Sequence, residues 1–329
     1  MRDRLESAAD VLGRAGEVAI VCHLNPDGDA IGSSLALKLL LESLGKKADV
    51  YNRDRVPDTL RGLEGWEQVQ SLDRLPEHPE LLVFLDCADY ARVAGKDSEA
   101  LDRAFAGASC RLQIDHHGTN PLYCDINVVE PLPATAVLIW RLAKLMGVAL
   151  TRPLAECLYA ALSTDTGNFT QDNTDAECFG MMEELMQAGI RLVPLCRALF
   201  AERSRAQVQL IAAALSSIRY SEDGHVSCMY LDRETMEKSG ARNEDTDTLV
   251  NFSRDIVGVD MTFLARETPD GIRISLRAVA PWRVDGVASA FGGGGHAQAS
   301  GCTIHEGLAE AVEKVWQACI QSHRTQEDA

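Results

Sequence analysis

Short apolar runs alternate with longer amphipathic stretches along the first half of the chain. The runs that predict buried strands cover residues 18–22, 47–51, 81–85 and 111–114, where aliphatic and β-branched side chains follow one another. The stretches with helical periodicity cover residues 31–44, 134–145, 153–163 and 174–188. Strands that alternate with helices predict an α/β fold, with a mostly parallel sheet flanked by helices.

The pattern changes after a helical stretch at residues 192–217. Beyond it, strands are predicted at 226–231, 260–265 and 272–278, and helices at 246–255, 284–291 and 308–322. A chain of 329 residues also exceeds the usual size of one domain. We therefore expect one domain over residues 1–190, a helical connector over 191–218 and a smaller α/β domain over 219–329.

Composition narrows the class of partners. The chain carries 49 acidic and 32 basic residues, a formal net charge of −17. Such a surface gives no general attraction to long nucleic acid, so any bound nucleotide should be short and held by local positive groups. The ten cysteines include no CxxC pair and are expected to be reduced thiols. The polar start of the chain and the absence of an apolar run of ~20 residues predict a cytoplasmic protein without a membrane segment.

Carboxylates and histidines follow the apolar elements at four places. They are His23, Asp27 and Asp29 after the first strand, Asp86 after the third, Asp115, His116 and His117 after the fourth, and Asp165 at the end of a predicted helix. Because the carboxyl ends of parallel strands meet at one edge of the sheet, these four pieces can converge. Carboxylates together with imidazoles are the ligands that a pair of divalent cations needs.

The spacing of the first piece predicts how its side chains point. Asp27 and Asp29 are two residues apart, so in an extended loop both point the same way, and Gly28 between them permits tight curvature. Taken singly, this Asn-Pro-Asp-Gly segment is equally typical of an exposed turn. Asp86 taken singly is equally typical of a helix cap.

The third piece offers two imidazoles side by side. His116 and His117 are neighbours, and in an extended chain neighbouring side chains face opposite directions. One ring can then bind metal while the other faces the substrate. Asp115 is suited to orienting a histidine.

These pieces together resemble the four motifs of the DHH phosphoesterase superfamily. The motifs are His-Leu-Asn-Pro-Asp-Gly-Asp-Ala at 23–30, the lone Asp86, Asp-His-His at 115–117 and Ser-Thr-Asp-Thr-Gly at 163–167. The run Phe-Gly-Gly-Gly-Gly-His at 291–296, followed by Ala-Ser-Gly at 299–301, looks like the signature loop of the associated DHHA1 domain. Segments 244–246 and 249–251 are similar to the nano-RNase branch, which contains bifunctional oligoribonucleases that also dephosphorylate 3′-phosphoadenosine 5′-phosphate (PAP). The resemblance implies a DHH catalytic domain over residues 1–190 and a DHHA1 substrate-binding domain over 219–329.

The resemblance also implies the metal ligands and the chemistry. One Mn²⁺ would be held by His23, Asp27 and Asp86, and a second by Asp29, Asp86, His116 and Asp165. Mg²⁺ or Co²⁺ would also fit such ligands. The expected mechanism is in-line attack of a hydroxide held between the two metals on phosphorus. His117 would stabilise the transition state or protonate the leaving oxygen, and Asp115 would orient a histidine.

The glycine run is the expected substrate-binding site. Its residues are Arg277, Gly293, Gly294, Gly295, His296 and Ser300. Glycines let backbone N–H groups approach a phosphate closely, and the N-terminus of a helix expected after the loop would add positive potential. The histidine and serine would donate to the phosphate, and the arginine would pair with it bidentately. Related chains carry Ser and Lys after the strand arginine, whereas Ala278 and Val279 stand here, so Arg283 is a candidate for the missing charge.

The leading prediction is a phosphodiesterase that cuts di- to pentaribonucleotides into mononucleotides and removes the 3′-phosphate of PAP. The same chemistry on linear or cyclic dinucleotides, such as pApA and c-di-AMP, is the nearest alternative. A single-strand DNA exonuclease related to RecJ, an inorganic pyrophosphatase and a non-catalytic nucleotide-binding module remain further alternatives. Short RNA, dinucleotides and PAP are the expected partners, with a homodimer as one possible assembly.

Overall fold

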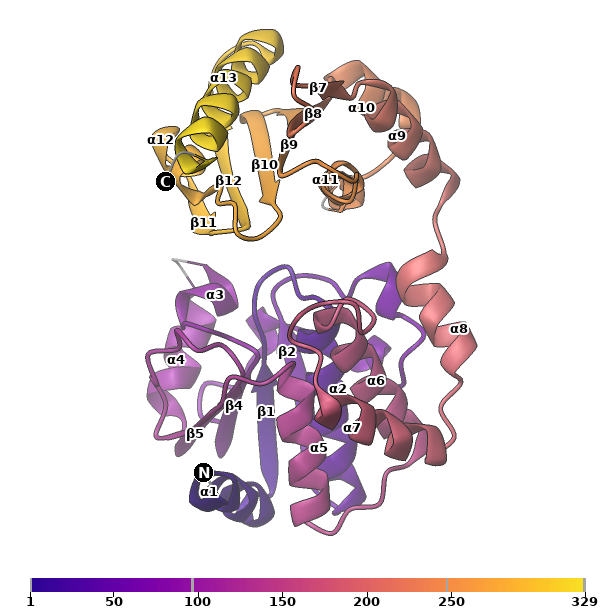
Figure 1. Cartoon of the computed structure of the whole chain (residues 1–329). Helices are drawn as coiled ribbons and strands as arrows, with labels where there is room; N and C mark the ends of the chain where they lie inside the picture. Colours follow the sequence, from indigo (N-terminus) through magenta and orange to yellow (C-terminus); the bar gives the residue numbers. More distant parts are fainter. Residues whose placement is uncertain (1, 96–97, 247, 328–329) are drawn as a thin grey trace. The chain divides into compact units, whose positions relative to one another are not determined.

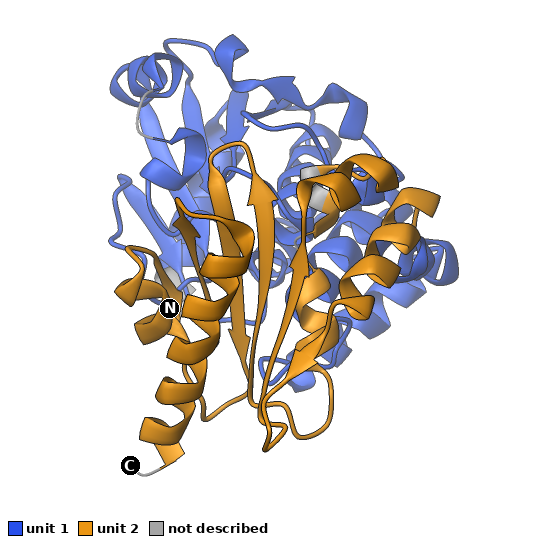
Figure 2. Cartoon of the chain, turned by 90° about the horizontal axis from the view of Figure 1, so that it is seen from above, with its two compact units in different colours: residues 1–202 blue, residues 203–329 orange. Residues whose placement is uncertain are grey.

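The computed structural model describes residues 2–95, 98–246 and 248–327. Within it the chain forms two compact units, residues 1–202 and 203–329, coloured separately in Figure 2. Each unit has a sheet and hydrophobic cores of its own. In the described part of the chain, no helix is both long enough and apolar enough to cross a membrane.

The first unit is built on a six-stranded sheet in which every neighbouring pair is parallel. The strands are β1 (Glu17–Val21), β2 (Lys47–Asn52), β3 (Gln70–Ser71), β4 (Leu81–Leu85), β5 (Cys110–Asp115) and β6 (Ile126–Val129). Their order is β3-β2-β1-β4-β5-β6. From β1 the chain adds β2 and β3 on one side, and β4, β5 and β6 follow on the other, so the direction of strand addition reverses between β1 and β4. In open parallel sheets, ligands bind beyond the carboxyl ends of the strands at such a switch point.

Helices cover both faces of this sheet (Figure 1). They are α1 (Arg2–Arg14), α2 (Gly28–Ser43), α3 (Ala91–Ala94), α4 (Glu99–Gly107), α5 (Thr135–Leu145), α6 (Arg152–Asp165), α7 (Ala176–Gln187) and α8 (Leu192–Cys196). Alternate residues of β1 and β4 pack against α2, α5 and α6 on one face and against α4 on the other. All five residues of β4 are buried, which is why the strand is a continuous apolar run.

The second unit has a mixed sheet of order β11-β12-β10-β9-β8-β7. Its strands are β7 (Arg219–Tyr220), β8 (Val226–Leu231), β9 (Met261–Thr268), β10 (Gly271–Ala278), β11 (Gly294–His296) and β12 (Ala299–Ile304). Only β8 and β9 pair in parallel. Helices α12 (Asp285–Ala290) and α13 (Leu308–Glu327) cover one face, and α9 (Arg205–Ser216) and α11 (Leu249–Arg254) the other, with α10 (Arg233–Ser239) after β8.

The α/β fold predicted from the sequence, with a mostly parallel first sheet and a smaller second α/β unit, is confirmed. The helical stretch at 192–217 divides into α8, a π-helical turn at Arg197–Ala201, and α9. The expected helix after the glycine run is wrong, because β11 and β12 form a hairpin there and α12 comes before the glycines. The positive potential of a helix N-terminus therefore cannot act from that side.

Candidate metal centre

The ends of β1, β4 and β5 bring the predicted metal ligands to one edge of the first sheet. His23 lies just beyond β1, Asp86 directly follows β4, and Asp115 is the last residue of β5. Asp165 ends α6 on the neighbouring helical layer. The structure thus gathers residues more than a hundred positions apart, as the switch-point topology predicts.

The first piece differs from its expected conformation. Asp27 is the N-cap of α2, where its Oδ1 accepts a hydrogen bond from the Ala30 N–H at 3.0 Å, and Asp29 lies in the first helical turn. The expected extended loop is therefore wrong. A Cβ on Gly28 would overlap the side chain of Thr164, so glycine is required by the close approach of α2 and α6 rather than by curvature.

Asp86 lies between two groups of ligand atoms. Its Oδ2 is 3.4 Å from Nε2 of His23, which is itself 3.7 Å from Oδ1 of Asp27. Its Oδ1 is 3.4 Å from Nε2 of His116, and that nitrogen is 3.1 Å from Oδ2 of Asp165. The two oxygens of Asp86 thus face different groups, an arrangement suited to a carboxylate shared by two cations.

Asp29 completes the second group from a fully buried position. Its Oδ2 is 4.0 Å from Nε2 of His116. Its carboxylate accepts hydrogen bonds from Ser33 Oγ at 2.7 Å and from the backbone N–H groups of Thr135 and Ala136 at 2.6 and 3.1 Å. These two N–H groups belong to the first turn of α5, where orphan donors stabilise negative charge.

Both metal-facing imidazoles are oriented through their other nitrogen. Nδ1 of His23 lies 2.7 Å from the Leu24 carbonyl oxygen, and Nδ1 of His116 lies 2.9 Å from that of Leu132. A carbonyl can only accept, so each Nδ1 carries the proton in the neutral ring. Nε2 is left with a lone pair directed at the carboxylates, as metal-binding histidines require.

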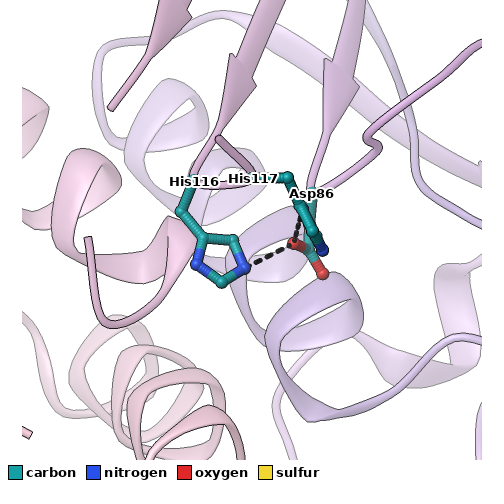
Figure 3. A group of neighbouring side chains, drawn as sticks. All are labelled: Asp86, His116 and His117. Atoms are coloured by element: carbon teal, nitrogen blue, oxygen red, sulfur yellow. Dashed lines mark ion pairs between the residues drawn. The ribbon is translucent and has the colours of Figure 1, made fainter. Parts of the chain in front are cut away.

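His116 and His117 do not face opposite directions. Their ring centroids are 4.5 Å apart, and both rings point toward Asp86 (Figure 3). The alternation expected for an extended chain is wrong here because the pair lies beyond the end of β5. His117 is the more exposed of the two, with 30% of its side chain accessible against 15% for His116.

Asp115 holds His117 through a network that the sequence did not disclose in full. Its Oδ1 is 2.8 Å from His117 Nδ1 and accepts the His116 N–H at 2.8 Å. Its Oδ2 accepts from Asn120 Nδ2 at 2.5 Å. Neither Asn120 nor the contact from Thr135 Oγ1 to Asp86 Oδ1 at 3.3 Å was predicted from the sequence. The predicted helix start at residue 134 could have indicated the Thr135 contact, because the N-terminus of a helix attracts carboxylates.

The pKa shifts of the clustered side chains show that positive charge stabilises the buried carboxylates. Burial, together with the charges of Asp29 and Asp86, raises the pKa of Asp165 to about 9, and burial raises the pKa of Asp29 to about 7. Burial also acts to raise the pKa of Asp86, but hydrogen bonds from His116 and His23 outweigh it, and the net pKa lies below the usual range. The pKa of His23 and that of His116 rise to about 10, because the neighbouring carboxylates outweigh burial. A buried carboxylate whose charge is costly is stabilised by a bound proton, and equally by a bound divalent cation. The residues present therefore fit the expected metals.

The predicted phosphate-binding residues lie together at one end of the second sheet. Arg277 pairs across the sheet with Ala299, and the hairpin of β11 and β12 places His296 opposite Ala299. Ser300 is 6% exposed, and its Oγ donates to the His296 carbonyl at 2.7 Å. The hydroxyl thus fixes the hairpin backbone.

Two glycines of the hairpin are required by its geometry. A Cβ on Gly293 would overlap the Gly301 carbonyl, and Gly295 adopts φ +143° with Ala299 O only 2.6 Å from its Cβ position. Gly294 has open space around the corresponding position. Close backbone packing therefore accounts for Gly293 and Gly295, and leaves Gly294 free to serve a ligand.

Comparisons with known proteins agree with this architecture. The DHH family N-terminal domain matches residues 17–162, and the DHHA1 domain matches residues 223–321. A bifunctional oligoribonuclease and PAP phosphatase NrnA of Thermus thermophilus is 33% identical over 320 residues, covering 96% of this chain and 93% of the relative. The NrnA of Bacillus subtilis is 26% identical, covering 86% of this chain and 88% of that protein.

A solved structure matches the whole chain. The crystal structure of an exopolyphosphatase-related protein from Bacteroides fragilis superposes with a TM-score of 0.92 at 28% identity, covering 100% of this chain and 98% of that one. The predicted family and its nano-RNase branch are thereby confirmed. The chain belongs to the DHH and DHHA1 phosphoesterase family, in the branch of the NrnA proteins, and is a hydrolase of phosphoester bonds.

Proposed function

We propose that this enzyme is a Mn²⁺-dependent phosphoesterase that degrades di- to pentaribonucleotides to mononucleotides and removes the 3′-phosphate of PAP. The observation that carries the proposal is the position of Asp86, whose two oxygens face two separate groups of ligands. The activity printed in the name of the Thermus relative, which matches almost the full length of the chain, supports the choice of substrates.

The donor set fits two cations. His23, Asp27 and Asp86 would hold the first, and Asp29, Asp86, His116 and Asp165 the second. Carboxylates mixed with imidazoles suit Mn²⁺, and also Mg²⁺ and Co²⁺. When bound, such a pair supplies positive charge for the phosphoryl oxygens and lowers the pKa of water toward neutrality.

His117 has a separate role in the proposal. Its Nδ1 is held by Asp115, so the ring is fixed and its Nε2 can hold a proton for the leaving oxygen. Asn120 in turn holds Asp115 and keeps the carboxylate in this orientation. We therefore assign Asp115 as the positioning residue for His117.

Substrate binding is proposed for the second unit. Arg277 supplies a guanidinium that can pair with a phosphate through two hydrogen bonds, and His296 supplies a further donor. Gly293, Gly295 and Ser300 shape the hairpin that presents them, and Gly294 leaves open space for a ligand. Arg283 pairs with Asp285 at 2.6 Å, so this carboxylate offsets the positive charge that Arg283 was expected to offer to the phosphate.

Short substrates are proposed because the chain has a net charge of −17. A strongly negative protein repels a long polyanion, whereas a substrate with few phosphates can be held by local positive groups. The same reasoning makes a long single strand of DNA a poor substrate.

A substrate panel tests the proposal. The purified protein with Mn²⁺ would be incubated with pApA, c-di-AMP, a five-nucleotide RNA, a long RNA or DNA strand, PAP and pyrophosphate, beside Asp86→Asn and the exposed Asp73→Asn as a matched control. We expect turnover of the short RNAs and of PAP, loss of activity in the first variant, and none lost in the second. Preference for the long strand would favour an exonuclease, and turnover of dinucleotides alone would favour signal degradation. Full activity of Asp86→Asn would contradict the metal assignment.

A further inference from the structure

The second unit contains a group of two imidazoles and one carboxylate that the proposed reaction does not use. His225 directly precedes β8, Asp260 directly precedes β9, and His323 lies on α13. Strands β8 and β9 pair in parallel with Val226 opposite Met261, so the residues before them lie side by side. Helix α13 packs over this end of the sheet and brings its histidine to both.

The three side chains converge on one atom. Oδ2 of Asp260 is 2.8 Å from Nδ1 of His225 and also 2.8 Å from Nε2 of His323. The contact with His323 has hydrogen-bond geometry. Nδ1 of His225 is buried and makes no hydrogen bond to any residue that the structure describes, although the oxygen is so near. The contact of this nitrogen with Asp260 thus lacks the geometry of a hydrogen bond.

The surroundings fix the three residues in place. The Asp260 N–H donates to the His225 carbonyl at 2.8 Å, and the Val279 N–H donates to the Asp260 carbonyl at 2.9 Å. The ring of Trp282 stacks on that of His323, with centroids 4.1 Å apart and planes at 19°. The side chain of His323 is 3% exposed, whereas that of His225 is 45% exposed. The His323 side of the cluster is therefore tightly packed and shielded from water, and the His225 side is open to it.

We propose that His225, Asp260 and His323 bind a transition-metal ion of the zinc class, with water in the fourth position. Two imidazoles and one carboxylate are a frequent ligand set for Zn²⁺. Ligand atoms around a tetrahedral zinc lie about 3.3 Å apart, given bonds of about 2.0 Å, so the two separations from Asp260 Oδ2 need to widen by about 0.5 Å. The bound ion cross-links the starts of β8 and β9 to α13 and so fastens the last helix to the sheet.

This site differs in chemistry from the centre in the first unit. There, four carboxylates accompany two ligating imidazoles, a set that suits Mn²⁺; here, imidazoles outnumber the carboxylate. Zn²⁺ binds more tightly than Mn²⁺ to imidazole sites in general, so the second unit should select it even when Mn²⁺ is abundant.

The test uses the full-length protein kept in excess Mn²⁺ and titrated with Zn²⁺. We expect a bound zinc that survives gel filtration, an anomalous peak at the zinc edge between the three side chains, and a rise in Tm. His225→Ala removes a half-exposed ligand whose ring stacks on that of His323, with centroids 5.3 Å apart, whereas His305→Ala removes an exposed histidine of the same unit as a control. Changes to residues that only orient a metal ligand weaken metal binding about 10- to 100-fold, so losing the ligand His225 itself should weaken zinc binding at least about 100-fold.

A second readout does not depend on the stability of the variants. Co²⁺ or Ni²⁺ bound at this site should quench the fluorescence of Trp282, and the quenching should disappear in Trp282→Phe and in His225→Ala but not in His305→Ala. Turnover of phosphoester substrates in Mn²⁺ should be unchanged in His225→Ala, which separates this site from the proposed reaction. Equal zinc affinity in His225→Ala and wild type, or an anomalous map without a peak here, would overturn the proposal.

Discussion

Gly32→Ala is expected to destabilise the first unit, although such a change normally stabilises a helix. Gly32 lies inside α2, where α2 crosses α6. A Cβ at this position would lie 2.6 Å from the Cys157 carbonyl oxygen and 2.9 Å from the Cβ and backbone nitrogen of Ala161. Backbone atoms cannot move aside as a flexible side chain can, so the two helices must separate.

The magnitude follows from two opposing terms. Ordinary contact begins near 3.4 Å, so α2 must move by roughly 0.8 Å, and overpacking of this kind costs about 1–3 kcal/mol. Replacing glycine by alanine in a helix contributes about 1 kcal/mol of stability. Gly180→Ala, inside the exposed α7 with nothing within 4 Å of its Cβ position, gains this contribution without the clash. The difference in stability between the two variants should therefore be about 1–3 kcal/mol.

Urea unfolding at one temperature measures this difference, with Trp140 of α5 reporting on the first unit. The shift should also reach the metal centre, because α2 carries Asp27 and Asp29 while α6 carries Asp165. Mn²⁺ affinity should fall in Gly32→Ala and stay unchanged in Gly180→Ala. If both variants gained stability equally, the helix crossing would not be as close as the structure has it, and the reasoning would fail.

Three further changes probe the site. Asp115→Asn should lower kcat about 10- to 100-fold, because Asp115 holds His117 in place. Metal analysis should find that the variant retains Mn²⁺ as wild type does. Loss of Mn²⁺ would instead mean that Asp115 is a metal ligand. Arg277→Ala should raise KM on a dinucleotide about 10- to 100-fold, with the exposed Arg273→Ala on the same strand as control, and unchanged kinetics would refute a phosphate contact. Because burial and the neighbouring carboxylates raise the pKa of Asp165 from 3.8 to about 9, its folded state holds the proton more tightly than the unfolded state, so stability that is fully present below about pH 3.8 is lost as pH rises from there to about 9. The Tm of EDTA-treated protein should fall over this range and that of Mn²⁺-loaded protein should not; parallel curves would contradict the argument.

The strands that carry the ligands could be predicted because they are buried on both faces. Their apolar runs are unambiguous, and a parallel sheet necessarily gathers the polar residues that follow them. β12 was missed because Ala299–Ile304 contains serine and glycine where β-branched residues are expected, and pairing with β10 decides its conformation. β6 was missed as well, a strand of four residues at the edge of the first sheet.

The local geometry of the site was less accessible from sequence. Asp27 is a regular N-cap, and an N-cap aspartate followed by a helical pattern could have been recognised. The reason for Gly28 and Gly32 could not, since it depends on α6, more than a hundred residues away. The hydrogen bonds from the first turn of α5 to Asp29 likewise join residues more than a hundred positions apart, so they could not be predicted either.

The backbone at Asp86 gives an independent argument that the cluster exists for a ligand. Its φ is +51°, in the left-handed region where non-glycine residues are strained by roughly 1 kcal/mol or more. The Asp86 N–H donates to Ile114 O at 3.1 Å, so the backbone stays paired in this conformation. What the turn achieves is to aim one carboxylate at both His23 and His116. The strain opposes folding, whereas in the metal-free protein hydrogen bonds from His116 and His23 outweigh burial and hold the pKa of the Asp86 carboxyl below its usual range. Asp86→Gly would relieve roughly 1 kcal/mol of strain but would remove the carboxylate that His23 and His116 share, which costs about 3–5 kcal/mol. The Tm of the metal-free variant should therefore fall below that of metal-free wild type, and Mn²⁺ should no longer raise it.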